Sequence, residues 1–411
     1  FIKATWTQNS STAHWRQREG EQPFFSIFNL MTTHQSRANV WSWEQFEEEI
    51  GSQLSADERH DPDEAPIWPF YPDTPTVRKT VARYYDCITV MDKQVGEILQ
   101  QLEDDGLADV TIVFFYSDHG MGMPRGKRLL HDSGMHVPLL IRFPEKWKHL
   151  APAQPGETTD RLVSFVDFAP TVLSLLELPI PDYMQGHAFL GKGDARPRDF
   201  VVGARDRVDE AFDVARSVRD ERYLLIRNFM PHLPWMQPER YSDGADMRRE
   251  LKRMAAEGQL KGGARQFARA PRPPFEFYDT LRDPHQTNNL MGANFEIAGG
   301  ERNMAAFARL RMLLALWAGE TRDLGFIPEP IMWNLIETTG KTPWEIFQGT
   351  DENPLDAFVP VQRLIAGISA DPVRINPSKP AAQRYWYAVN LHRLARAGMD
   401  VNRELEIGLN D

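Results

Sequence analysis

The chain has 411 residues, and its 58 acidic residues outnumber 47 lysines and arginines, which gives a formal net charge of −11 at pH 7. This balance argues against a nucleic-acid-binding protein, which needs a basic surface, but it is compatible with a local basic pocket for a small anion. No apolar run has the length of a membrane span, and the length of the chain predicts two or three domains.

The first elements predicted along the chain are a strand and a long helix. The run PFFSIFNL at 23–30 is short, apolar and continuous, which is typical of a buried strand. Within residues 77–102, apolar side chains recur four and three positions apart, which predicts one helix with a cap at Asp73 or Thr74. Cys87 lies in this helix, and we interpret it as a buried small residue and not as a nucleophile.

Two further strands and a helix follow. The runs at 110–116 and 137–143 predict strands, and 166–178 predicts a helix with Asp167 at its first turn. Strand, helix and strand in this order indicate a crossover between parallel strands. Residues 1–195 are therefore predicted to form a doubly wound α/β domain with helices on both faces of a parallel or mixed sheet.

The pattern changes near residue 195. Residues 215–229 and 275–290 predict strands with charged turns, and 304–323 predict a helix. We therefore expect a smaller α+β subdomain at 196–335, followed by a mostly helical extension at 336–411.

Polar residues with metal-binding or anion-binding chemistry follow two of the predicted strands. Asp118 and His119 follow the carboxyl end of the predicted strand at 110–116, and His34 follows the predicted strand at 23–30. If these strands are parallel, the three side chains converge on one rim of the sheet, where ligands bind in open α/β folds. Arg125 and Lys127 lie on the loop that leaves this rim. A solvated polar loop is the plain alternative for each residue taken alone.

Several motifs in order resemble the sulfatase family of the alkaline phosphatase superfamily. They are TIVFFYSDHG, RGKRLLHDSGMHVPLLIRFP, PFFSIFNLMTTHQS and FEFYDTLRDPHQTNNL. Within that family, the spacing in DHGMGMPRGK is most similar to the sulfamidase (heparan N-sulfatase) group and its bacterial relatives. The resemblance implies an alkaline-phosphatase-like α/β fold and a hydrolase that acts on a small sulfated sugar or a sulfated polysaccharide fragment. It also implies a periplasmic or secreted protein.

The resemblance implies roles for four residues. Asp118 and His119 match metal ligands, and Lys127 matches the basic residue that holds the sulfate. His34 matches the histidine beside the leaving-group atom. One divalent cation is expected, with Ca²⁺ first by resemblance and Mn²⁺ or Zn²⁺ as alternatives because His119 is an imidazole ligand.

The nucleophile that the resemblance implies does not occur in the sequence. Sulfatases use a formylglycine made from the Cys or Ser of a C/S-x-P-S-R motif, and Cys87 lies in DCITV instead. We therefore expect the 411 residues to be part of a longer protein and to be inactive alone. Two other readings stay open: a phosphodiesterase or phosphonate monoester hydrolase of the same superfamily, and a non-catalytic remnant.

Overall fold

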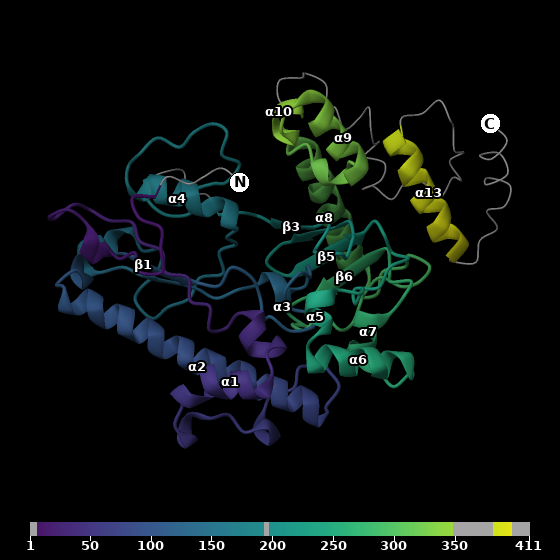
Figure 1. Ribbon diagram of the computed structural model, residues 1–411. Coiled ribbons are helices and arrows are strands. Elements are labelled where there is room, and N and C mark those ends of the chain that lie inside the picture. Colours follow the sequence, from purple (N-terminus) through teal and green to yellow (C-terminus); the bar gives the residue numbers. More distant parts are fainter. Residues whose placement is uncertain (1–5, 193–196, 348–380, 397–411) are drawn as a thin grey trace.

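The computed structural model describes residues 6–192, 197–347 and 381–396 (Figure 1). The helices are α1 (Trp43–Glu49), α2 (Pro75–Asp104), α3 (Asp132–Met135), α4 (Phe168–Leu175), α5 (Arg240–Asp243), α6 (Asp246–Ala256), α7 (Gly262–Ala268), α8 (Glu301–Glu320), α9 (Glu329–Thr339), α10 (Pro343–Phe347), α13 (Ala381–Arg396) and the π-helix η2 (Ser36–Val40). The strands are β1 (Val113–Tyr116), β2 (Leu139–Arg142), β3 (Val201–Arg205), β4 (Ala215–Arg219), β5 (Tyr223–Asn228) and β6 (Phe275–Asp279). Short 3-10 turns join several of them. None of the described helices is both long enough and apolar enough to cross a membrane.

The long helix α2 forms as its sequence predicts. Thr74 caps it, because its hydroxyl oxygen accepts a hydrogen bond from the N–H of Val77, and Pro75 occupies the first turn. The helix buries one apolar stripe that includes Val77 and Cys87. Burial raises the pKa of the Cys87 thiol to about 12, so this thiol stays protonated and unreactive at neutral pH. The interpretation of Cys87 as a core residue is confirmed.

The parallel pairing predicted for the first strands is wrong for the described residues. β1 pairs with β2, and the two strands are antiparallel. Residues 23–30 are extended but belong to no strand; Phe24 and Phe28 pack against Trp15, whereas Phe25 is 60% exposed. An extended segment becomes a strand only when its backbone pairs with a neighbouring strand, and none of the described strands pairs with this one.

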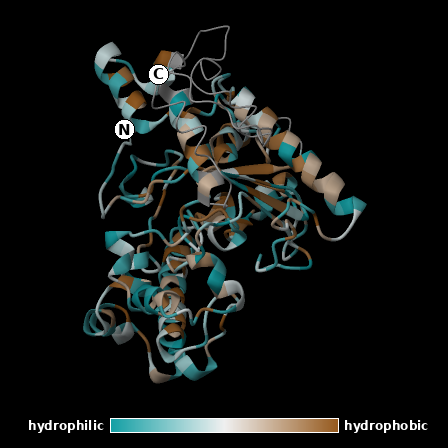
Figure 2. Ribbon diagram, turned by 90° about the vertical axis from the view of Figure 1, so that its right-hand side faces the viewer, coloured by the Kyte–Doolittle hydropathy of each residue, from teal (hydrophilic) through white to brown (hydrophobic). Residues whose placement is uncertain are grey.

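A second sheet confirms the α+β region predicted after residue 195. Its four strands are antiparallel in the order β3-β4-β5-β6. Side chains alternate across β5, as expected for a strand buried on both faces. Tyr223 and Leu225 face α8, where they join a core with Leu310, and Leu224 and Ile226 face the opposite side. Figure 2 shows the apolar residues concentrated in these central strands.

The core on that opposite face joins segments from both predicted domains. It contains Val77 and Val81 of α2, Leu129 of the loop after β1, and Leu224 and Ile226 of β5. Helices α6 and α7 cover the same face (Figure 1). The mixture of helices and strands confirms the α/β class, while the boundaries predicted at 195 and 335 stay predictions. Much of the predicted extension, at 348–380 and 397–411, lies outside the described residues.

One predicted cap has a different role. Asp167 directly precedes α4, but its carboxylate makes no cap to that helix. It is buried, accepts hydrogen bonds from the N–H groups of Ser164 and His187, and forms an ion pair with Arg198. Asp167 therefore holds three segments together around the start of α4.

Candidate active site

A loop that we call the site loop, residues 117–134, follows β1 and carries three of the four predicted site residues. It folds back on itself, because the N–H of Gly120 donates to the carbonyl of Gly134 over 2.9 Å. A Cβ atom at Gly120 would lie 2.0 Å from the carbonyl oxygen of Ser133, so only glycine fits there. The turn after Asp118 and His119 therefore requires the glycine that follows them.

The site loop is fixed to the four-stranded sheet and its connections. Arg205 of β3 donates to the carbonyl oxygen of Arg128 at 2.8 Å. The guanidinium of Arg125 donates to the carbonyl of Gln286 at 2.5 Å, and the side-chain oxygen of Gln286 accepts from the N–H of Asp132 at 3.0 Å. These contacts explain why a loop of this length is held in one conformation beside the sheet.

Asp118 and His119 present their side chains on the same side of the site loop. Nε2 of His119 lies 3.6 Å from Oδ1 of Asp118. Nδ1 of His119 lies 2.7 Å from the carbonyl oxygen of Gly120, which only accepts, so this nitrogen carries the proton. Nε2 is then the ring nitrogen that can offer a lone pair to a cation, and it lies 3.6 Å from the carboxylate oxygen of Asp118.

Oδ1 of Asp118 and Nε2 of His119 are placed so that they could be two of the ligands of one divalent cation. Two neighbouring ligands of one ion, each about 2.0–2.4 Å from it, lie roughly 3–4 Å apart. A histidine that binds a metal commonly donates its other ring N–H to a carbonyl oxygen, as His119 does toward Gly120. The Asp118 side chain is 83% exposed, so the remaining coordination positions are open. Within the described ranges, no group of three or more His, Cys, Asp or Glu side chains is placed to hold a metal.

His34 lies immediately before Gln35 and η2, at the end of the extended segment. Its Nδ1 is 2.8 Å from the hydroxyl oxygen of Ser36. Burial lowers the pKa of His34, and the positive charges of Lys127 and Arg37 lower it further. The charge of His119 acts in the same direction, and that of Asp118 opposes it. His34 is therefore an imidazole held mostly neutral at pH 7.

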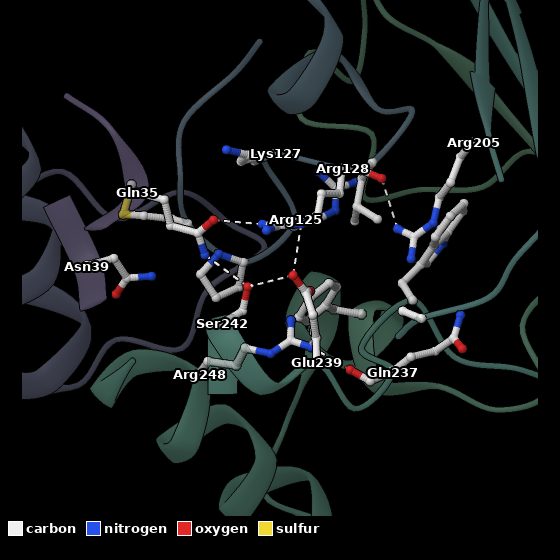
Figure 3. A pocket seen from close by; sticks show the side chains of 16 residues that line it. Gln35, Asn39, Arg125, Lys127, Arg128, Arg205, Gln237, Glu239, Ser242 and Arg248 are labelled. Atoms are coloured by element: carbon white, nitrogen blue, oxygen red, sulfur yellow. Dashed lines mark hydrogen bonds and ion pairs between the residues drawn. The ribbon is translucent and has the colours of Figure 1, made fainter. Parts of the chain in front are cut away.

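Lys127 is a half-buried cation. Burial lowers its pKa, as does the neighbouring charge of Arg128, while Asp118, Asp209 and Glu239 raise it. Among the residues that the structure describes, no carboxylate forms an ion pair with its ammonium group, and in Figure 3 no dashed line joins Lys127 to the other residues that line the cavity. A lysine that is partly desolvated and lacks a protein counter-ion is suited to bind an external anion.

The charges of Lys127, Asp118 and His119 all act on the pKa of His34, so the structure brings these four side chains near one another. It does so although the segment 23–30 and β1 do not pair as the parallel strands that were expected to bring them together. The packing of η2 against α2 positions His34 instead. The buried guanidinium of Arg83 in α2 donates to the carbonyl oxygens of Arg37 at 2.6 Å and Trp41 at 2.9 Å.

Arg125 and three residues that line a cavity have roles that the sequence did not predict. Arg125 is buried, and its guanidinium lies 4.5 Å from the centre of the Phe70 ring, so it supports the loop, and it also lines the cavity that Lys127 lines. The sequence analysis missed Gln35, Arg128 and Glu239, which line a cavity with Lys127. Gln35 and Arg128 lie in the quoted motifs beside His34 and Lys127, whereas Glu239 lies in none of them, and no local pattern shows that the three residues meet.

Two family models match the chain. Residues 6–178 match the model described as sulfatase, and residues 123–257 match the model described as N-sulphoglucosamine sulphohydrolase, C-terminal. The second match includes the site loop from residue 123 onward together with β3, β4 and β5. The chain is thus related to the sulfatases, and the resemblance seen in its motifs is confirmed.

Curated relatives agree with these matches. The chain is 37% identical to an ulvan-active sulfatase of Formosa agariphila over 360 residues, which is 80% of this chain and 57% of that protein. It is 28% identical to the N-sulphoglucosamine sulphohydrolase of Homo sapiens over 327 residues, which is 75% of this chain and 62% of that protein. The chain therefore spans less than two thirds of the length of either relative.

Among solved structures, a 2-O GAG sulfatase aligns with a TM-score of 0.43 and 18% sequence identity. The alignment covers 74% of this chain and 56% of that one.

Proposed function

We propose that the protein to which these 411 residues belong hydrolyses sulfate groups from a sulfated carbohydrate. The observation that carries the proposal is the half-buried ammonium group of Lys127, which has no ion-pair partner among the described residues, together with His34, whose pKa is lowered by burial and by the charge of Lys127. The family models and both relatives, which are sulfatases by their descriptions, support this chemistry.

Lys127 would bind an oxygen of the sulfate and stabilise the negative charge on it. The charge of Lys127 acts on the pKa of His34, and we propose that His34 faces the leaving group of a sulfate bound at Lys127. Once protonated, its imidazole would donate a proton to the departing oxygen or nitrogen atom. Because an O-sulfate and an N-sulfate present the same tetrahedral oxygens to Lys127, both linkages are candidates.

Asp118 and His119 would hold one divalent cation, with Ca²⁺ as the first candidate and Mn²⁺ or Zn²⁺ as alternatives. When bound, the cation would add positive charge beside the sulfate oxygens. The proposed nucleophile is a formylglycine outside the 411 residues, because they contain no C/S-x-P-S-R motif. We place the whole protein in the periplasm or outside the cell, where such polysaccharides occur.

A substrate panel tests the proposal with the full-length protein. It contains an O-sulfated sugar, an N-sulfated sugar, an aryl sulfate and a phosphonate monoester. Release of sulfate from either sugar in preference to hydrolysis of the phosphonate supports a carbohydrate sulfatase. Preferential hydrolysis of the phosphonate would instead assign the phosphonate monoester hydrolase reaction, and no hydrolysis of any compound would indicate a non-catalytic remnant.

A further inference from the structure

The side chain of Arg128 in the site loop contacts three residues from other segments of the chain. Its Nη1 donates to Oε1 of Gln35 at 2.6 Å, its Nε lies 2.8 Å from Oε1 of Glu239, and its Nη2 lies 3.3 Å from Oδ2 of Asp209. The side chain is 14% exposed. The backbone has a φ of +77°, a left-handed conformation that is unfavourable for arginine and persists only where contacts enforce it.

These contacts join the immediate neighbours of the two proposed catalytic residues. Gln35 follows His34 and Arg128 follows Lys127 in the sequence. The amide nitrogen of Gln35 also donates to Ser242 at 2.9 Å. The hydroxyl of Ser242 donates to Glu239 at 3.0 Å, which closes a ring of contacts around Arg128 (Figure 3). Gln35, Glu239 and Ser242 are all buried.

The charge balance distinguishes Arg128 from its neighbour. Its guanidinium is compensated by the carboxylates of Glu239 and Asp209, whereas Lys127 has no such partner in the described part of the chain. A mostly buried guanidinium whose charge is already compensated is poorly suited to bind an additional anion. Its contacts instead hold the segments that carry Gln35 and Glu239 in place beside the site loop.

A second contact holds the same two segments together without Arg128. The side-chain nitrogen of Asn39 in η2 lies 3.4 Å from the carbonyl oxygen of Gly122 in the site loop. A Cβ atom at Gly122 would lie 2.7 Å from Cα of Gln35, so the two backbones touch at this point. The spacing of the segments is therefore set by direct packing as well as by the Arg128 contacts.

We infer that Arg128 is a positioning residue whose contacts with Gln35 and Glu239 fix the spacing between His34 and Lys127. The substrate would then meet both residues in the geometry needed for sulfate binding and proton donation. This inference rests on the proposed function, because it concerns the same two residues.

The test uses the full-length protein and two readouts, steady-state kinetics on a sulfated sugar and calorimetric binding of inorganic sulfate. Arg128→Met should lower kcat roughly 10- to 100-fold and weaken sulfate binding, because misplaced reacting groups lose rate steeply. Gln35→Met should act similarly. The double variant should lose about as much as the worse single variant, because both changes break the same contact. Arg128→Lys should recover part of the loss.

A matched control separates positioning from general loss of stability. Arg222→Met removes an ion pair with Asp279 whose side chains are 21% and 6% exposed, close to the 14% and 7% of Arg128 and Glu239. It should lower the melting temperature and leave kcat and sulfate binding nearly unchanged. Equal kcat losses in Arg222→Met and Arg128→Met would overturn the inference, as would losses that multiply fully in the double variant.

A glycine substitution tests the same spacing independently. Gly122→Ala should push the site loop away from Gln35 and reproduce the kcat loss, whereas Gly319→Ala in α8, with open space around it, should not. Wild-type kinetics for Gly122→Ala in a folded protein would contradict the inference. If the unaltered protein releases no sulfate from any compound, the proposed function fails instead; sulfate binding that is weakened by Arg128→Met and not by Arg222→Met would still support the positioning role.

Discussion

Nε2 of His131 lies 3.1 Å from Oε2 of Glu276, which joins the site loop to the last strand of the four-stranded sheet. Both side chains are almost fully buried. Glu276 also accepts hydrogen bonds from Asn228 at 2.7 Å, Trp235 at 3.0 Å and Tyr278 at 2.8 Å. Burial alone would raise the pKa of Glu276, but the hydrogen bond and the charge of His131, together with the hydrogen bonds from Asn228 and Tyr278, outweigh it and lower the pKa to about 2.

The first prediction concerns stability. Glu276→Gln should lower the free energy of unfolding by about 3 kcal/mol, because buried donors lose their charged acceptor and the new amide donor faces them. Denaturant unfolding followed by circular dichroism measures this. The exposed Glu97→Gln on α2 is the control and should change stability by less than about 0.5 kcal/mol.

The pH dependence of that stability follows from the lowered pKa. The contribution of Glu276 is fully present above its usual pKa of 4.5 and is lost as the pH falls toward about 2. The stability difference between wild type and Glu276→Gln should therefore shrink across this range. A difference that stays constant from pH 5 to pH 2.5 would contradict the assignment of Glu276 as a charged acceptor.

The second prediction concerns Lys127. In the full-length protein, Lys127→Ala should lower kcat/KM on a sulfated sugar by about 10²–10³, the usual effect of losing one charge-stabilising group. Lys127→Arg should keep more activity because it keeps the charge. The exposed Lys146→Ala serves as the control, and an equal effect in both alanine variants would remove Lys127 from the proposed site.

The third prediction concerns His34. His34→Ala should slow hydrolysis of a sulfated sugar far more than that of an activated aryl sulfate, whose leaving group needs little proton donation. Because burial and the charge of Lys127 lower the pKa of His34, the rate on the sugar should fall as the pH rises through a value below the usual 6.5. Lys127→Ala removes a positive charge that lowers the pKa of His34, so the pH at which the rate on the sugar falls should move to a higher value. Equal losses on both substrates would exclude the acid role.

The fourth prediction concerns the metal. Full-length protein with Asp118→Asn or His119→Ala should retain less of the bound divalent cation, as measured by elemental analysis after dialysis. The readout does not depend on activity. Asp109→Asn, an exposed carboxylate before β1, should keep the wild-type metal content. Unchanged metal content in both site variants would show that Asp118 and His119 do not hold the ion.

Local patterns predicted α2, β5 and α8 well, because each of these elements buries a regular apolar stripe or alternating faces. The apolar run at 23–30 predicts a strand that is not among the described strands, because an apolar run does not reveal whether a partner strand lies beside it. The same limit applies to the site. Motif spacing marked Asp118, His119 and Lys127, but the contact between Gln35 and Arg128 spans 93 residues and depends on tertiary packing.

The most direct test of the central claim is the release of inorganic sulfate from a sulfated sugar by the full-length protein. It is compared with the 411-residue chain and with full-length Lys127→Ala, all confirmed to be folded. We predict turnover by the full-length protein, none above background by the 411 residues alone, and a loss of about 10²–10³ in the Lys127→Ala variant. Sulfate release by the full-length protein that is unaffected by Lys127→Ala would contradict the account of this site.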